Sequence, residues 1–205
     1  GNGDDVLSGG ADNDSLTGGA GTDTFKVDVG TDTITDLGGA SGGETDVLIV
    51  SAGATANATN ITSFTADSST SNSGTANLTT KVGGGTIDIG NSTTGAYSLT
   101  GLSGNDTLKG NGNADIINGG GGDDNIDGRG GNDEINGGAG DDIITVSSAG
   151  QGDGDTIDGG SGTDTLSLSS GSHAFATDAK LQNINSITRA STSTVIDLTG
   201  QTESL

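Results

Sequence analysis

The sequence predicts an all-β fold, in which short parallel strands wind into solenoid segments that alternate with Ser/Thr-rich β interludes. Eleven nine-residue units recur, most of them open with glycine, and all eleven carry a large apolar residue at the eighth place. A three-residue strand with one inward apolar side chain, followed by a six-residue turn, makes half a coil. Two units, or 18 residues, therefore complete one coil, and the coils stack along one axis.

Composition alone would also fit a disordered acidic linker. The chain has 205 residues with 41 Gly, only 28% apolar residues and 2% aromatics. Disorder, however, would not impose an apolar eighth place on every unit. The periodic pattern therefore favours an ordered solenoid.

The charge restricts the partners. Twenty-eight acids against 6 bases give a formal net charge of -22, which opposes binding to nucleic acid or to anionic membrane surfaces and favours cations. The longest strongly apolar run, Val47 to Val50, is far too short to cross a membrane, so we expect no direct membrane insertion. The absence of Cys excludes disulfides and thiolate metal sites.

Four segments follow along the chain. Repeat units fill residues 1–35 and 101–167, the second block being interrupted by four extra residues at 146–149. Residues 36–100 and 168–205 lose the period and are rich in Ser, Thr and short β-branched runs. A weaker match between the two interludes predicts a tandem array of modules of about 110 residues, from which this chain would be a fragment.

The interludes contain several predicted strands. Alternating β-branched residues bounded by Gly or Asn predict strands at 45–50, 61–66, 76–82, 86–89, 96–100, 181–189 and 194–199. Residues 67–75 are a loop by composition.

Glycine at the fourth place suits the tight turns, because such turns need positive φ. Eight of the eleven units have Gly there, and the exceptions are Asp12, Asn113 and Asp153. Asn and Asp tolerate left-handed φ better than other side chains, so we expect these three residues to adopt it too.

The sixth place carries an aspartate in every unit. The set is Asp5, Asp14, Asp23, Asp32, Asp106, Asp115, Asp124, Asp133, Asp142, Asp155 and Asp164. Units 18 residues apart stack, and two carboxylates ~5 Å apart repel by roughly 3 kcal/mol. Ca²⁺ would remove this repulsion, since it takes carboxylate and carbonyl oxygens together; Mg²⁺ is stricter in geometry, and zinc would need His or Cys.

These units resemble the RTX nonapeptide GGxGxDxUx, where U is a large apolar residue. GGAGTDTFK (18–26) and GGAGDDIIT (137–145) match it at every fixed place. The resemblance implies a right-handed parallel β-roll with several Ca²⁺ ions along both turn edges, held by the sixth-place Asp and by turn carbonyls. Some units depart from the pattern, at Val27 and Asp28 and, in the second place, at Leu102, Asn111, Arg129 and Gln151. The extra residues at 146–149 are expected to break the stacking between Asp142 and Asp155.

Other polar residues have plainer interpretations. The fifth-place acids Asp4, Asp123 and Asp141 are expected to face solvent, and Tyr97 to pack on a strand. Glu44 and Asp46 precede an apolar strand, where they could cap it or bind a further ion. His173 is the single histidine and has no partner motif that would indicate catalysis.

Three classes of function remain. No Ser-His-Asp set, HExxH motif or phosphate loop is present, so we expect no enzyme activity, although such units also serve as secretion and folding modules of secreted enzymes. The chain resembles large RTX-type proteins of Gram-negative surface layers and extracellular filaments, which implies a calcium-dependent structural region that self-assembles outside the cell. The alternative is the stalk of an adhesin. In either case, calcium outside the cell would turn binding energy into folding energy.

Overall fold

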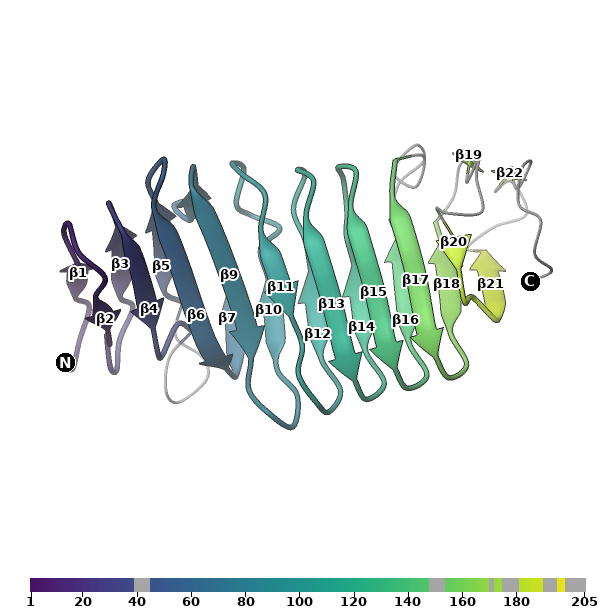
Figure 1. The fold of residues 1–205 in the computed structure, drawn as a ribbon, viewed down its shortest axis with the longest axis horizontal. Helices are drawn as coiled ribbons and strands as arrows, with labels where there is room; N and C mark the ends of the chain where they lie inside the picture. Colours follow the sequence, from purple (N-terminus) through teal and green to yellow (C-terminus); the bar gives the residue numbers. More distant parts are fainter. Residues whose placement is uncertain (39–44, 148–153, 170–171, 175–180, 190–194, 198–205) are drawn as a thin grey trace.

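The computed structural model describes residues 1–38, 45–147, 154–169, 172–174, 181–189 and 195–197. Throughout this described part the chain forms strands and turns without a helix, and every strand pairing is parallel. The coils follow one another along the long axis from the N-terminal to the C-terminal end (Figure 1). The predicted all-β parallel solenoid is confirmed. No helix in the described residues is long and apolar enough to cross a membrane.

One face of the solenoid is a sheet of nine strands in sequential order. Its strands are β2 (Ser15–Leu16), β4 (Thr31–Ile34), β6 (Thr55–Ile61), β9 (Thr75–Thr80), β11 (Ser98–Thr100), β13 (Ile116–Gly121), β15 (Glu134–Ala139), β17 (Thr156–Ser161) and β20 (Leu181–Gln182).

The opposite face consists of two sheets. The four-stranded sheet contains β1 (Val6–Ser8), β3 (Thr24–Val27), β5 (Val47–Val50) and β8 (Ser71–Asn72). The seven-stranded sheet contains β7 (Ser63–Thr65), β10 (Thr86–Asp88), β12 (Thr107–Lys109), β14 (Asn125–Asp127), β16 (Ile143–Val146), β18 (Thr165–Leu168) and β21 (Ser186–Arg189). A separate pair joins β19 (Ser172–Ala174) to β22 (Val195–Asp197).

The eighth-place residues form the core between the two faces. Leu108 pairs in register with Ile126, and Ile126 pairs with Ile144, so the coil length in the second block is the predicted 18 residues. Ten of the eleven eighth-place side chains are buried, and Leu7 is partly buried against them. Each coil thus contributes one apolar residue to each face, which explains how a chain with so few apolar residues can fold.

The described part of the first interlude continues the same solenoid. The nine-stranded sheet passes from β4 through β6, β9 and β11 to β13 without a break. The five strands predicted between residues 45 and 100 are present as β5, β7, β9, β10 and β11. Two strands were missed. β8 lies in the stretch predicted as a loop. Most of β6 precedes the predicted strand 61–66, and its inward residues before Ile61 are Ala56 and Ala58, which are too small to signal a buried strand in the sequence.

The extra residues at 146–149 do not break the stack, so this prediction was wrong: Asp142 bonds to Asp164, and Asp155 belongs to the row of Asp133. Ile135 pairs with Ile157 and Ile144 pairs with Leu166, each 22 rather than 18 residues ahead. Strand pairing restores the register on both faces after the longer connection, because the buried apolar residues fix the alignment.

The prediction of left-handed φ at the fourth place was also wrong for two of the three residues there that are not glycine. Among residues other than Gly in the described part, only Asn60, Arg129 and Asn183 have positive φ, so Asp12 and Asn113 do not adopt the left-handed conformation. Asp153 lies outside the described residues.

Candidate metal centre

The sixth-place aspartates lie where turns enter strands, and the structure brings them into rows along the edges. Asp106, Asp124, Asp142 and Asp164 precede the strands β12, β14, β16 and β18; we call them the seven-strand row. Asp14, Asp32, Asp115, Asp133 and Asp155 lie at the starts of strands β2, β4, β13, β15 and β17, and form the nine-strand row. Asp5 and Asp23 precede β1 and β3 of the four-stranded sheet.

Within each row, aspartates on neighbouring strands are joined by hydrogen bonds from main chain to carboxylate; in the nine-strand row, strands β6, β9 and β11 separate Asp32 from Asp115. The N–H of Asp106 donates to Oδ1 of Asp124, and the N–H of Asp124 donates to Oδ1 of Asp142, both at 2.8 Å. The same bond links Asp115 to Asp133, Asp133 to Asp155, Asp142 to Asp164, Asp14 to Asp32 and Asp5 to Asp23. Because Asp133 and Asp142 reach partners 22 residues ahead, the rows run past the extra residues at 146–149.

The second carboxylate oxygen is left without a donor in most of the buried aspartates. The Oδ2 atoms of Asp32, Asp106, Asp124, Asp133, Asp142 and Asp164 are buried and make no hydrogen bond. Such an oxygen has lost its water without gaining a partner, which is costly for a charged group. A cation bound at each edge would supply what these oxygens lack.

The first-place glycines leave room for that cation. A Cβ atom at Gly119 would collide with Oδ2 of Asp124 and with the carbonyl oxygen of Gly137 in the next coil. The same holds at Gly101, where a Cβ would collide with Oδ2 of Asp106 and the carbonyl oxygen of Gly119. A carboxylate and a carbonyl from successive coils therefore face one small space, which is the oxygen set that Ca²⁺ takes.

Burial changes the acidity of these groups. Desolvation, together with the neighbouring carboxylates of its row, raises the pKa of Asp133 to about 8. Desolvation likewise raises the pKa of Asp124 to about 6, with the charges of Asp142 and Asp106 adding to the effect. Without a cation, both carboxylates therefore hold protons more tightly than they would in water.

The donor set excludes the ligand clusters of a typical transition-metal site. In the described part of the chain, no three His, Cys, Asp or Glu side chains come together in a group that could hold a metal. An ion bound between the coils would find main-chain carbonyl oxygens, such as that of Gly137, beside the carboxylates. This mixture suits a hard cation with a high coordination number.

Comparison with known families agrees with this geometry. The model of the RTX calcium-binding nonapeptide repeat matches residues 1–34, 93–126, 119–148 and 149–172, which together make up more than half of the chain. The chain belongs to the RTX calcium-binding repeat family. RTX repeats bind several Ca²⁺ ions, so Ca²⁺ is the cation of this β-roll. No curated protein matches the chain significantly.

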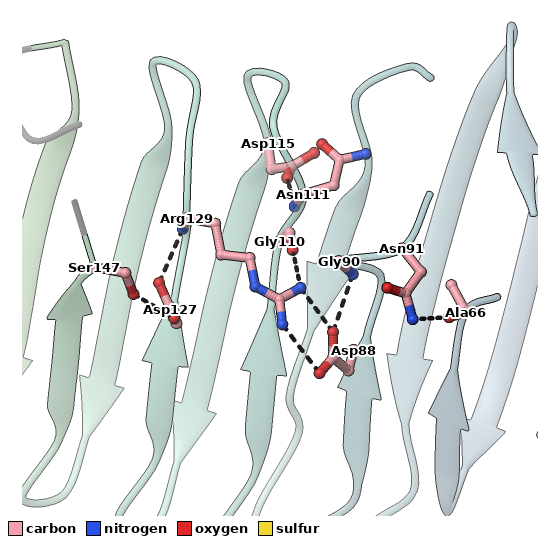
Figure 2. Close-up of polar contacts among 10 residues, drawn as sticks. All are labelled: Ala66, Asp88, Gly90, Asn91, Gly110, Asn111, Asp115, Asp127, Arg129 and Ser147. Carbon is pink, nitrogen blue, oxygen red and sulfur yellow. Dashed lines mark hydrogen bonds and ion pairs between the residues drawn. The ribbon is translucent and has the colours of Figure 1, made fainter. Parts of the chain in front are cut away.

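Within this RTX chain, two buried acids have both oxygens occupied by protein donors. Asp115 accepts from the N–H of Tyr97 on Oδ1 and from the N–H of Asn111 on Oδ2, both at 2.8 Å (Figure 2 shows the latter bond). Asp46, 23 residues after Asp23, accepts from the N–H groups of Asp23 and Gly38, also at 2.8 Å. Asp46 thus extends the line of Asp5 and Asp23 on the four-stranded sheet, with a main-chain donor on each of its two oxygens.

The ends of the rows differ from their centres. Asp5 is 48% exposed and Asp14 is partly exposed, whereas Asp23 and Asp32 one coil further on are buried. After Asp164 the place of the acid is taken by Asn185, whose Oδ1 accepts from the N–H of Asp164 at 2.7 Å. Sequence analysis missed Asn185, because an amide can continue the hydrogen-bonded row without matching the repeat.

The remaining candidates have structural roles. Asp4, Asp123 and Asp141 are exposed as predicted, and each also accepts a main-chain N–H from the adjacent coil through its Oδ1. Tyr97 is buried, as expected for a packing residue, and its hydroxyl pairs with Ser92. His173 is buried, with Nε2 3.3 Å from the carbonyl oxygen of Ser169. Glu44 lies outside the described residues.

Proposed function

We propose that this RTX region is a calcium-dependent structural part of a secreted Gram-negative surface protein, of the surface-layer or extracellular-filament kind, that folds on reaching calcium outside the cell. In this role the chain has no catalytic activity of its own. Its function is to become a rigid, elongated spacer and to assemble with other copies when calcium is present.

The observation that carries this proposal is the set of buried Oδ2 atoms without hydrogen-bond donors. They repeat along the stack, and each belongs to a carboxylate whose Oδ1 already accepts a main-chain N–H from the preceding coil. Without the ion, the same residues that join the coils also repel one another. Folding and calcium binding are therefore one process, which suits a chain that is exported before it folds.

The shape of the molecule supports a structural role. The described coils form an elongated stack, with strands on both faces and turns along both edges (Figure 1). Each coil contacts mainly its neighbours, so ordering can spread along the axis from coil to coil. The stack can thus be long and stiff although each unit contributes few apolar residues.

A direct test combines folding with assembly. We would follow the purified chain by analytical ultracentrifugation and negative-stain electron microscopy, first in EDTA and then in millimolar CaCl₂. The proposal predicts an expanded monomer in EDTA, and sheets or filaments after calcium is added. A folded chain that stays monomeric in calcium at high concentration would contradict self-assembly and favour the alternative of an adhesin stalk.

A further inference from the structure

Arg129 stands where the RTX unit normally has its second glycine, and its side chain reaches back across two coils. Its Nη1 lies 2.7 Å from Oδ1 of Asp88, and its Nη2 lies 3.1 Å from Oδ2 of the same carboxylate. Nη1 also donates to the carbonyl oxygen of Gly110 at 2.8 Å. The guanidinium thus binds oxygens from the two preceding coils (Figure 2).

The surrounding residues are shaped for this side chain. A Cβ atom on Gly90 would overlap the guanidinium, so the glycine leaves the space in which the guanidinium lies. Arg129 itself has φ of 66°, a left-handed conformation that is unfavourable for a residue with a side chain. Its main-chain N–H donates to Oδ1 of Asp127 at 3.0 Å, which helps to hold the turn. The ion pair therefore forms in spite of an unfavourable backbone.

The oxygens around the guanidinium are of the same kind as those beside Gly101 and Gly119. They are a carboxylate and the carbonyl oxygen of a first-place glycine, contributed by successive coils, and the arginine supplies the positive charge. A planar guanidinium binds a carboxylate through two parallel hydrogen bonds and is always charged. It can therefore join oxygens between coils as an ion would, although with fixed direction.

The neighbouring acid on this edge, Asp115, is also satisfied by protein donors. Both oxygens of Asp115 accept main-chain N–H groups, and the side chain of Asn111 donates to the carbonyl oxygen of Gly95 at 3.0 Å. Asp106, on the opposite edge of the same coil, keeps its Oδ2 buried without a donor. The two edges of this coil thus differ in their need for a cation.

We infer that the guanidinium of Arg129 takes the place of one calcium ion between the coils of Asp88, Gly110 and Arg129. At this edge, where the first interlude meets the second repeat block, the coils are then joined without a metal ion. The inference rests on calcium binding elsewhere in the chain. Arg129 therefore determines where the row of ions on this edge begins in the second repeat block, and Asp133 is the first acid of that block on this edge that still has an oxygen without a donor.

The test counts bound calcium. Isothermal titration calorimetry and elemental analysis of the gel-filtered protein would compare the wild-type chain with Arg129→Gly, which restores the repeat consensus and removes the guanidinium. We expect Arg129→Gly to bind one more Ca²⁺ per chain than the wild type. The double variant Arg129→Gly/Asp88→Asn should return to the wild-type number, because the freed carboxylate is gone.

Leu102→Gly is the matched control. It restores the second-place glycine on the opposite edge, where the native side chain is 42% exposed and carries no charge. We expect no change in the number of ions. An unchanged number in Arg129→Gly, an equal gain in both single variants, or failure of Arg129→Gly to fold in excess calcium would each overturn the inference. A wild-type chain that binds no calcium would instead refute the proposed function.

Discussion

The N–H of Asp124 donates to Oδ1 of Asp142, one coil ahead, at 2.8 Å, while Oδ2 of Asp142 remains buried without a donor. The two oxygens of one carboxylate therefore have separate tasks. Oδ1 holds the neighbouring coil through the main chain, and Oδ2 is left for the cation. This division explains why an acid, rather than Asn or Ser, recurs at the sixth place of the repeat.

Replacing Asp124 by Asn separates these tasks. The amide oxygen can still accept the N–H of Asp106, but the amide nitrogen is no ligand for Ca²⁺. We expect the calcium concentration at the midpoint of folding to rise about tenfold or more, equivalent to about 1.4 kcal/mol. Circular dichroism during a calcium titration measures this midpoint.

Asp5→Asn is the comparison for this change, because Asp5 occupies the same place in its unit but is 48% exposed at the end of the stack. Its effect on the midpoint should be clearly smaller. Equal effects of the two substitutions would show that stacking between buried coils does not strengthen the central sites.

Gly119→Ala tests the space beside the carboxylates. The added methyl group would collide with Oδ2 of Asp124 and with the carbonyl oxygen of Gly137, so the coil must shift or the ion must leave. We expect a loss of calcium affinity together with a loss of stability of ~1–3 kcal/mol, the range for overpacked sites. Urea unfolding in saturating calcium measures the stability.

Gly121→Ala, two residues further on, is the control. The nearest atom to a Cβ there is the carbonyl oxygen of Ala139 at 3.8 Å, and Gly121 does not have positive φ. Alanine should be neutral or should stabilise the fold by up to ~1 kcal/mol, because it restricts the unfolded chain. If both alanines destabilised equally, loss of glycine flexibility rather than loss of ion space would be the cause.

Without calcium, the fold is expected to be more stable at pH 5 than at pH 8. The folded pKa of Asp133 is about 8, above its ordinary value of 3.8, so the folded state binds a proton that the unfolded chain releases. That contribution is complete below the unfolded pKa and disappears as the pH rises through 8. Asp124, with a pKa of about 6, contributes in the same direction at the acidic end of this range.

Far-UV circular dichroism of the metal-free chain, recorded as the pH is lowered from 8 to 5, gives the sign, because the β-sheet signal should be stronger at pH 5. Exposed carboxylates remain ionised at both, so the general repulsion among acids changes little between them. Asp133→Asn should reduce the difference. Higher stability at pH 8 in the metal-free wild type would mean that the buried row is not under charge repulsion.

Much of this structure follows from the period alone. The apolar eighth place predicted the core, and the sixth-place Asp predicted the rows, since both depend only on which residues stack at 18-residue intervals. Composition and spacing cannot show the donor that each oxygen meets, so Asp115 and Asp133 look alike in sequence. In the structure, the N–H of Asn111 occupies Oδ2 of Asp115, while Oδ2 of Asp133 stays without a donor.

The interruptions were harder to predict than the repeats. Counting nine-residue units along the sequence predicts a break at the extra residues 146–149. In the structure, however, strand pairing sets the register, and Ile157 still aligns with Ile135. Arg129 appeared only as a departure from the consensus, because its partner Asp88 lies 41 residues away in an interlude without the repeat. Such contacts depend on coil lengths that the sequence does not reveal.

The central claim is that the stack folds only when calcium occupies its acidic rows. Far-UV circular dichroism of the purified chain at pH 7.5, recorded in EDTA and again after excess CaCl₂ is added, tests this most directly. We predict a spectrum of an unfolded chain in EDTA and a β-sheet spectrum after calcium, restored reversibly on each addition. A β-sheet spectrum that is the same in EDTA and in calcium would contradict the account.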